Sequence, residues 1–166
     1  MIAEIHRKLG KSGSKLNDRL EDQLTGDFFG SLRYLPFDMG IKPILQNCVF
    51  PLHLLECLNG VQVDYWDEYM SFWNDCKWNR TEPDAVINLG EIVILIEVKL
   101  YSGLSSDDDV DSIPETIIQS QEEVFESSNQ LGRESRLLIS KFPNAKKRVL
   151  LLLAPEMLAT KIFESI

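Results

Sequence analysis

The sequence predicts an α/β protein with a central mixed sheet flanked by helices, in the order helix, three strands, helix, strand (αβββαβ). Apolar residues in segment 14–35 recur every four positions, as they do along one face of a helix. Segments 83–88 and 92–100 are short and apolar, which is typical of strands. A long helical pattern then leads to an apolar strand at 148–154, and such a crossover places the last strand parallel within the sheet.

Length and composition favour a single domain spanning residues 1–166, with its core at about 17–154. The chain has 166 residues, of which 44% are hydrophobic and 26% charged. Its longest apolar runs, 92–96 and 149–154, are much shorter than the roughly 18 residues of a membrane span. The three cysteines form no Cys-x-x-Cys pair, so a disulfide framework is not expected. We therefore expect a soluble cytoplasmic protein that does not contact a membrane.

The first predicted element is a helix from Ser14 to Leu35, ended by Pro36. Its apolar stripe is expected to face the core and consists of Leu16, Leu20, Leu24, Phe28 and Leu32. At 100° per residue, Glu21 lies within about 30° of the stripe centre, whereas Asp22 points about 130° away. Glu21 is therefore the acid expected to point inward.

The remaining elements follow from local patterns. Residues 37–60 look irregular, with a short helix at 52–58, and 61–66 reads as the first strand. The next two strands form a hairpin closed by Leu89-Gly90, since Gly tolerates a positive φ. Ser102 to Ser112 reads as a mobile loop, and a long helix is expected from Glu115 to Lys141.

Three charged residues on the hairpin suggest chemistry. Alternation along the strand puts Glu97 and Lys99 on one face. A Leu89-Gly90 turn would pair Asp84 with Leu95, and Asp84 would then lie diagonally across from Glu97, about 7–8 Å away between Cα atoms. Two carboxylates at that separation can share a cation, and a neighbouring lysine can hold or polarise a water. The alternative is an ordinary Glu97–Lys99 ion pair at a strand end.

These residues, read as Glu82-Pro83-Asp84 through Ile96-Glu97-Val98-Lys99, resemble the PD-(D/E)xK phosphodiesterase superfamily, whose fold is restriction-endonuclease-like. The resemblance extends over about residues 17–154. It implies a nuclease that binds Mg²⁺ or Mn²⁺ and hydrolyses phosphodiester bonds in DNA. The metal ligands it implies are Glu21, Asp84, Glu97 and the Val98 carbonyl. It further implies that Lys99 activates or orients the attacking water, and that Gln130 is a counterpart of a glutamine found after the lysine strand in some members.

The charge distribution is compatible with this interpretation. The net charge of −9 is concentrated in residues 101–130, where eight side chains are acidic and none is basic. Residues 131–150 carry six basic side chains and one acidic side chain, and could face a polyanion. DNA is therefore the expected partner, and a homodimer is also compatible with the sequence. The alternative function is a catalytically silent module of the same fold that binds nucleic acid or a partner protein.

Overall fold

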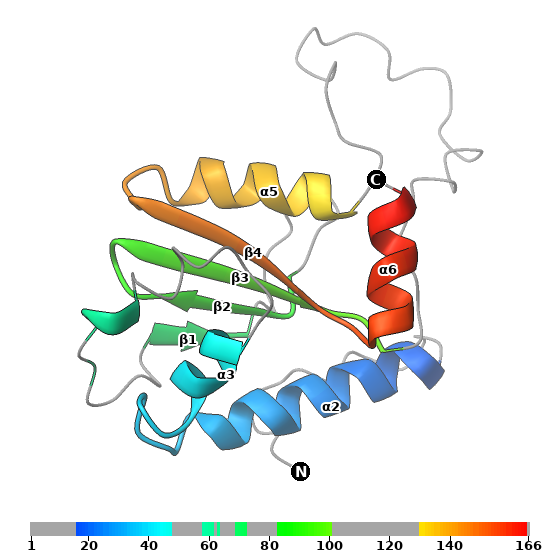
Figure 1. Cartoon of the computed structure of the whole chain (residues 1–166), viewed down its shortest axis with the longest axis horizontal. Coiled ribbons are helices and arrows are strands. Elements are labelled where there is room, and N and C mark those ends of the chain that lie inside the picture. The colour runs from blue at the N-terminus through cyan, green and yellow to red at the C-terminus, as the bar shows by residue number, and fades with distance from the viewer. Residues whose placement is uncertain are drawn as a thin grey trace, which may run out of the picture.

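A mixed four-stranded sheet forms the centre of the protein in the computed structural model, which describes residues 16–47, 58–61, 63, 69–72, 83–100 and 130–165. The strands lie in the order β1 (Met70–Ser71), β2 (Ala85–Asn88), β3 (Ile92–Val98) and β4 (Lys147–Leu153). β1 and β2 pair antiparallel, as do β2 and β3, whereas β4 runs parallel to β3. The predicted α/β class, the mixed sheet and the parallel last strand are therefore confirmed (Figure 1).

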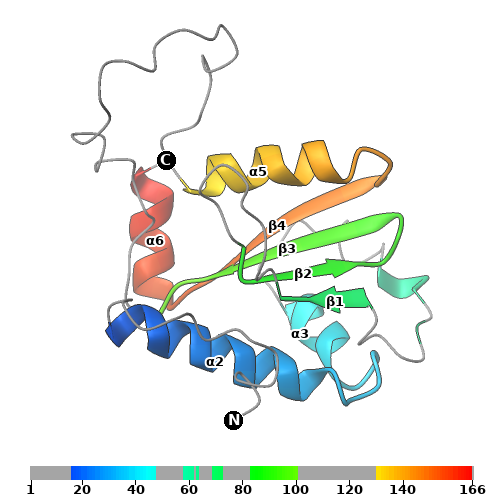
Figure 2. The ribbon, with the colours of Figure 1, turned by 180° about the vertical axis from the view of Figure 1, so that it is seen from behind.

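Helices cover both faces of the sheet. α2 (Leu16–Leu32) and α3 (Ile41–Asn47) lie on one side, and α5 (Gln130–Lys141) lies on the other (Figures 1 and 2). α6 (Glu156–Ser165) follows β4 and was not predicted from the sequence. Because α5 covers one face of β3, side chains of α5 and β3 can meet on that side.

Two apolar clusters explain why β3 is buried within the sheet. On the α2 and α3 side, Ile94 and Ile96 belong to the same buried cluster as Phe29 and Ile41. On the α5 side, Val93 and Leu95 are clustered with Leu137 and Leu138. Alternate residues of β3 thus face opposite layers, as the uninterrupted apolar pattern predicted. Burying each of these side chains contributes on the order of 1.5–3 kcal/mol to folding.

The hairpin turn differs from the prediction by one residue. Leu89 N donates to Ile92 O at 2.8 Å, so the two turn residues are Gly90 and Glu91, and Gly90 has a φ of 79°. Leu89 pairs with the next strand because its side chain packs against the core, which a turn residue could not do. Ala85 is consequently opposite Ile96, and extending this register by one residue puts Asp84 opposite Glu97, not Leu95. The partner of Asp84 thus differs from the prediction by two positions. Because side chains alternate along a strand, Asp84 still lies on the same face of the sheet as Glu97, as predicted.

The buried face of α2 is rotated from the predicted stripe. Leu20, Leu24 and Phe28 are 44%, 47% and 44% exposed. Their successors Glu21, Thr25 and Phe29 are buried, as are the glycines at 26 and 30. Both sets of residues recur every four positions, so the spacing alone does not distinguish them. The buried set lies beside the two glycines, whose small size allows the helix to approach the sheet. Glu21 still points inward as predicted.

Other boundaries also differ from the prediction. α2 ends at Leu32, before a turn that precedes Pro36. α3 forms within the segment expected to be irregular, supported by a 2.6 Å ion pair between Lys42 and Asp38. Residues 61 and 63 are not in a strand, and the first strand among the described residues is β1. Most of the proposed helix at 52–58, the loop at 102–112 and positions 115–129 of the predicted long helix lie outside the described residues.

Candidate functional site

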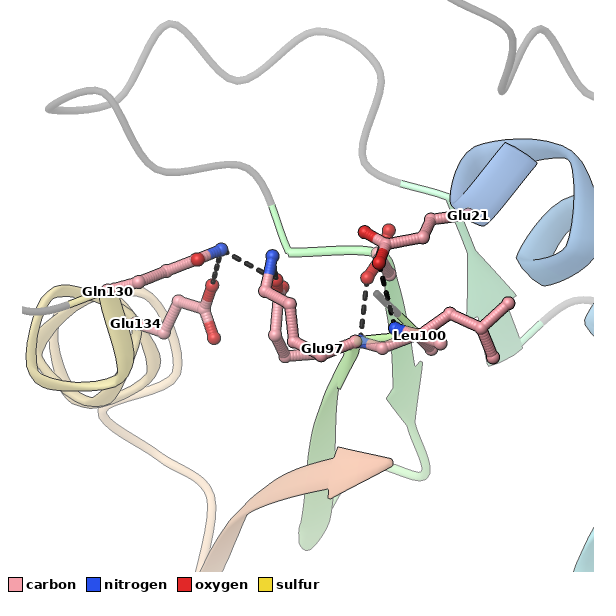
Figure 3. A network of polar contacts seen from close by, with 8 residues as sticks. Glu21, Glu97, Leu100, Gln130 and Glu134 are labelled. Carbon is pink, nitrogen blue, oxygen red and sulfur yellow. Dashed lines mark hydrogen bonds and ion pairs between the residues drawn. The ribbon is translucent and has the colours of Figure 1, made fainter. Parts of the chain in front are cut away.

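Side chains from four elements meet where β3 ends (Figure 3). Glu97 is near the end of β3 and Lys99 directly follows it. Asp84 immediately precedes β2, Glu21 lies on α2, and Gln130 is the first residue of α5. All five side chains predicted to form the site are thus brought to this region of the fold.

Two of the acids bind the backbone on either side of Lys99. Asp84 Oδ2 accepts a hydrogen bond from Val98 N at 2.7 Å. Glu21 Oε1 accepts one from Leu100 N at 2.8 Å. Hydrogen bonds to carboxylates are stronger than those between neutral groups, so these contacts hold the strand end in place. Glu21, and not Asp22, is the acid of α2 that makes this contact.

Glu97 is the most buried of the predicted acids. Its side chain is 2% exposed, and its Oε1 is 2.7 Å from Lys99 Nζ and 2.6 Å from Gln130 Nε2. The ion pair considered as an alternative from sequence is therefore present. Gln130 itself is buried, so it lies inside the site and not on the protein surface.

The acids keep Lys99 positively charged. Burial lowers the pKa of Lys99, but the charge of Glu97, the hydrogen bond to Glu97, and the charges of Asp84 and Glu21 together raise it above its usual value. The lysine side chain is 12% exposed. A protonated lysine donates hydrogen bonds and offsets negative charge, but it cannot accept a proton. The geometry therefore supports an orienting or electrostatic role for Lys99.

Negative charge accumulates around Glu97. Burial raises the pKa of Glu97, the charge of Asp84 raises it further, and Lys99 only partly offsets these effects. Burial together with the charge of Glu97 raises the pKa of Glu134 to about 9. The interaction of Glu134 with the Glu97 carboxyl acts in the same direction, so the metal-free site favours the protonated form of Glu134. Burial and mutual repulsion therefore disfavour the simultaneous ionisation of Glu97 and Glu134.

Glu134 was missed by sequence reasoning. It is 0% exposed, and its Oε1 accepts a hydrogen bond from Gln130 Nε2 at 3.1 Å. The available signal was its spacing: Glu134 lies one turn after Gln130 and one turn before Leu137 and Leu138, which face the sheet. Glu134 lies on the core-facing side of its helix, as Glu21 does on α2. An acid in such a position indicates either a buried partner or a functional site.

The donor chemistry of the site suits Mg²⁺. Within the described ranges, no three His, Cys, Asp or Glu side chains are already gathered as a metal centre. However, Glu97 Oε2 and Glu134 Oε2 are buried and accept no hydrogen bond from a described N–H or O–H group. Buried carboxylate oxygens of this kind are the hard ligands that Mg²⁺ prefers. Asp84 and Glu97, which are opposite each other when the strand register is extended by one residue, carry oxygens of the chemical kind that could hold such an ion.

Two basic residues of the segment 131–150, Lys146 and Lys147, lie away from these acids. Lys147 begins β4 and pairs with Ile92, whereas Leu153 at the other end of β4 pairs with Val98. Six residues of strand separate the two ends by roughly 20 Å. The exposed side chains of Lys146 and Lys147 thus lie at the opposite end of the sheet from Glu97.

Comparison with known proteins finds no family model, no curated protein and no solved structure that matches this chain. Within the part of the chain that the structure describes, no helix has the length and apolar character needed to cross a membrane.

Proposed function

We propose that this protein is a Mg²⁺- or Mn²⁺-dependent nuclease that hydrolyses phosphodiester bonds in DNA and has a restriction-endonuclease-like fold. The observation that carries the proposal is the end of the hairpin. There Glu97 is paired with Lys99, and Asp84 is opposite Glu97 when the Ala85–Ile96 register is extended by one residue. This is the arrangement implied by the resemblance of the Pro-Asp and Glu-x-Lys motifs to PD-(D/E)xK nucleases.

The cost of burial argues against a purely structural role for these charges. Removing an ion pair from water costs several kcal/mol per ion, and a strand end could hold apolar side chains at no such cost. Lys99 offsets only part of the rise in the pKa of Glu97 that burial and the charge of Asp84 cause. A divalent cation would supply the missing positive charge.

Each group then has a defined task. Asp84, Glu97 and the Val98 carbonyl would hold the ion, with Glu21 as a further acid beside them. When bound, the ion lowers the pKa of a coordinated water and stabilises negative charge on the phosphoryl oxygens. Lys99 presents a compact positive charge that orients water and offsets charge developing in the transition state.

A catalytically silent module that binds nucleic acid or a partner protein is the second candidate. One observation favours it: Glu97 Oε1 already has both Lys99 and Gln130 as partners. In a silent module this closed network would be the final state of the site. In a nuclease, the ion would bind at oxygens outside this network.

A cleavage assay separates the two candidates. Purified full-length protein is incubated with single- and double-stranded DNA and RNA in Mg²⁺, in Mn²⁺ and in excess chelator. The proposal predicts metal-dependent DNA cleavage that Lys147→Ala, at the far end of β4, leaves unchanged. Tight nucleic-acid binding without cleavage in either metal would favour the silent module.

A further inference from the structure

The side-chain amide of Gln130 joins two buried acids from different elements (Figure 3). Gln130 Nε2 lies 2.6 Å from Glu97 Oε1 on β3 and 3.1 Å from Glu134 Oε1 on α5. A primary amide nitrogen carries two hydrogens, so one is available for each acid. The amide therefore connects the helix to the strand end that carries Glu97 and Lys99.

The two acids determine which way this amide points. Rotating it by half a turn would bring Gln130 Oε1, which can only accept, against Glu97 Oε1, which is itself an acceptor, and would remove the N–H that is donated to Glu134 Oε1. With Glu134 in place, only one orientation of the amide satisfies both contacts. Without it, the second N–H would lose its acceptor in a buried position, and the amide would be able to turn away from Glu97.

We propose that Glu134 is a positioning residue, which holds the Gln130 amide in the orientation that donates to Glu97 and thereby fixes the Glu97 carboxylate. The inference deepens the proposed function, on which it rests for the role of Glu97 as a metal ligand. Groups that orient a ligand in this way typically change metal affinity or activity by 10- to 100-fold when removed.

The first test needs no metal. In ¹⁵N-labelled, metal-free protein, the side-chain amide of Gln130 is assigned by its disappearance in Gln130→Leu, and the solvent exchange of its two hydrogens is measured. We expect slow exchange of both hydrogens in the wild type and in Glu134→Gln, which retains an acceptor oxygen. In Glu134→Leu, both should exchange rapidly. An unchanged exchange rate for the hydrogen donated to Glu97 in Glu134→Leu would overturn the proposal.

The second test is a titration with Mn²⁺ alone. We expect Glu134→Leu to weaken Mn²⁺ binding about 10- to 100-fold and Glu134→Gln to bind as the wild type does. Leu138→Ala, a buried change on the same helix, should lower the melting temperature and leave the affinity unaltered. Equal loss in Glu134→Gln and Glu134→Leu would show that the charge of Glu134 is needed, which contradicts a positioning role.

A double variant tests whether Glu134 acts through Gln130. Glu134→Leu should add no further loss of Mn²⁺ affinity in a Gln130→Leu background. If Glu134→Leu does not fold, Gln130→Leu still decides, because wild-type affinity in that variant would overturn the proposal. Wild-type protein that binds no Mn²⁺ would instead contradict the proposed function, and the exchange of the Gln130 amide would still decide whether Glu134 positions it.

Discussion

Asp84 accepts a hydrogen bond from the backbone N–H of Val98 at 2.7 Å, which ties the residue before β2 to the residue after Glu97 in β3. The same carboxylate contributes to the raised pKa of Glu97. Asp84 therefore supports the strand end through one contact and repels its acidic neighbour through its charge. In a metal site these effects are compatible, because the ion removes the repulsion and leaves the hydrogen bond.

Asp84→Asn separates the two effects. The amide oxygen can still accept from Val98 N, but the negative charge is gone, so we expect a melting temperature equal to or above that of the wild type. Metal-dependent cleavage should be abolished. Asp84→Ala also removes the acceptor and should lose about 1 kcal/mol relative to Asp84→Asn. Thermal unfolding and cleavage are measured together. Undiminished nuclease activity in Asp84→Asn would remove Asp84 from the metal site.

Substitutions of Glu21 on α2 likewise separate the effect of its hydrogen bond from the effect of its charge. Glu21→Gln retains an acceptor for Leu100 N, whereas Glu21→Ala leaves that N–H without it. We expect Glu21→Ala to be about 1–2 kcal/mol less stable than Glu21→Gln, measured by urea unfolding. Both should bind Mn²⁺ more weakly than the wild type, because each loses a negative charge beside Lys99. Asp22→Ala is the control in the adjacent position and should bind Mn²⁺ normally.

The stability of the metal-free protein should depend on pH through Glu134. Its pKa is about 9 in the folded state against an ordinary value of 4.5, because it is buried and faces the negative Glu97 and Asp84. The folded state therefore holds a proton that the unfolded state releases as the pH rises above 4.5. This contribution to stability is fully present below pH 4.5 and is lost between pH 4.5 and 9, at no more than about 1.4 kcal/mol per pH unit.

Glu134→Gln should remove this dependence, because glutamine resembles the protonated acid. We expect the variant to gain stability relative to the wild type as the pH rises from 5 to 8, measured by urea unfolding in excess chelator. Parallel stability curves for the two proteins over this range would show that Glu134 is not held neutral. The same comparison in saturating Mg²⁺ shows how much of the effect the ion removes.

The parts of the fold that could be predicted from the sequence are those that local interactions determine. β3 and β4 were predictable because each is a short uninterrupted apolar run, although only β3 is buried along its length and Leu151 is the one buried residue of β4. The turn was displaced because the pairing of Leu89 depends on its packing against the core, which the local Leu-Gly pattern does not reveal. The α2 stripe was misassigned because four-residue spacing cannot distinguish Leu24 from Thr25 as the buried position.

The site was predictable to the extent that it follows from alternation along strands. Asp84, Glu97 and Lys99 share a face because any two-residue turn preserves their parity. Glu21 was found by its angle on the helix. The Gln130–Glu134 pair was only partly found, because its significance lies in contacts across the layer between α5 and β3, which no local pattern encodes.

The most direct measurement compares Mg²⁺-dependent DNA cleavage and Mn²⁺ affinity in Lys99→Ala and Glu97→Gln. The account predicts that Glu97→Gln loses both, since it removes a ligand. Lys99→Ala should retain Mn²⁺ binding but lose about 10²- to 10³-fold in cleavage rate, because its charge acts in the transition state. Cleavage by the wild type that persists in excess chelator, or that is unaffected by either substitution, would contradict the proposed nuclease site.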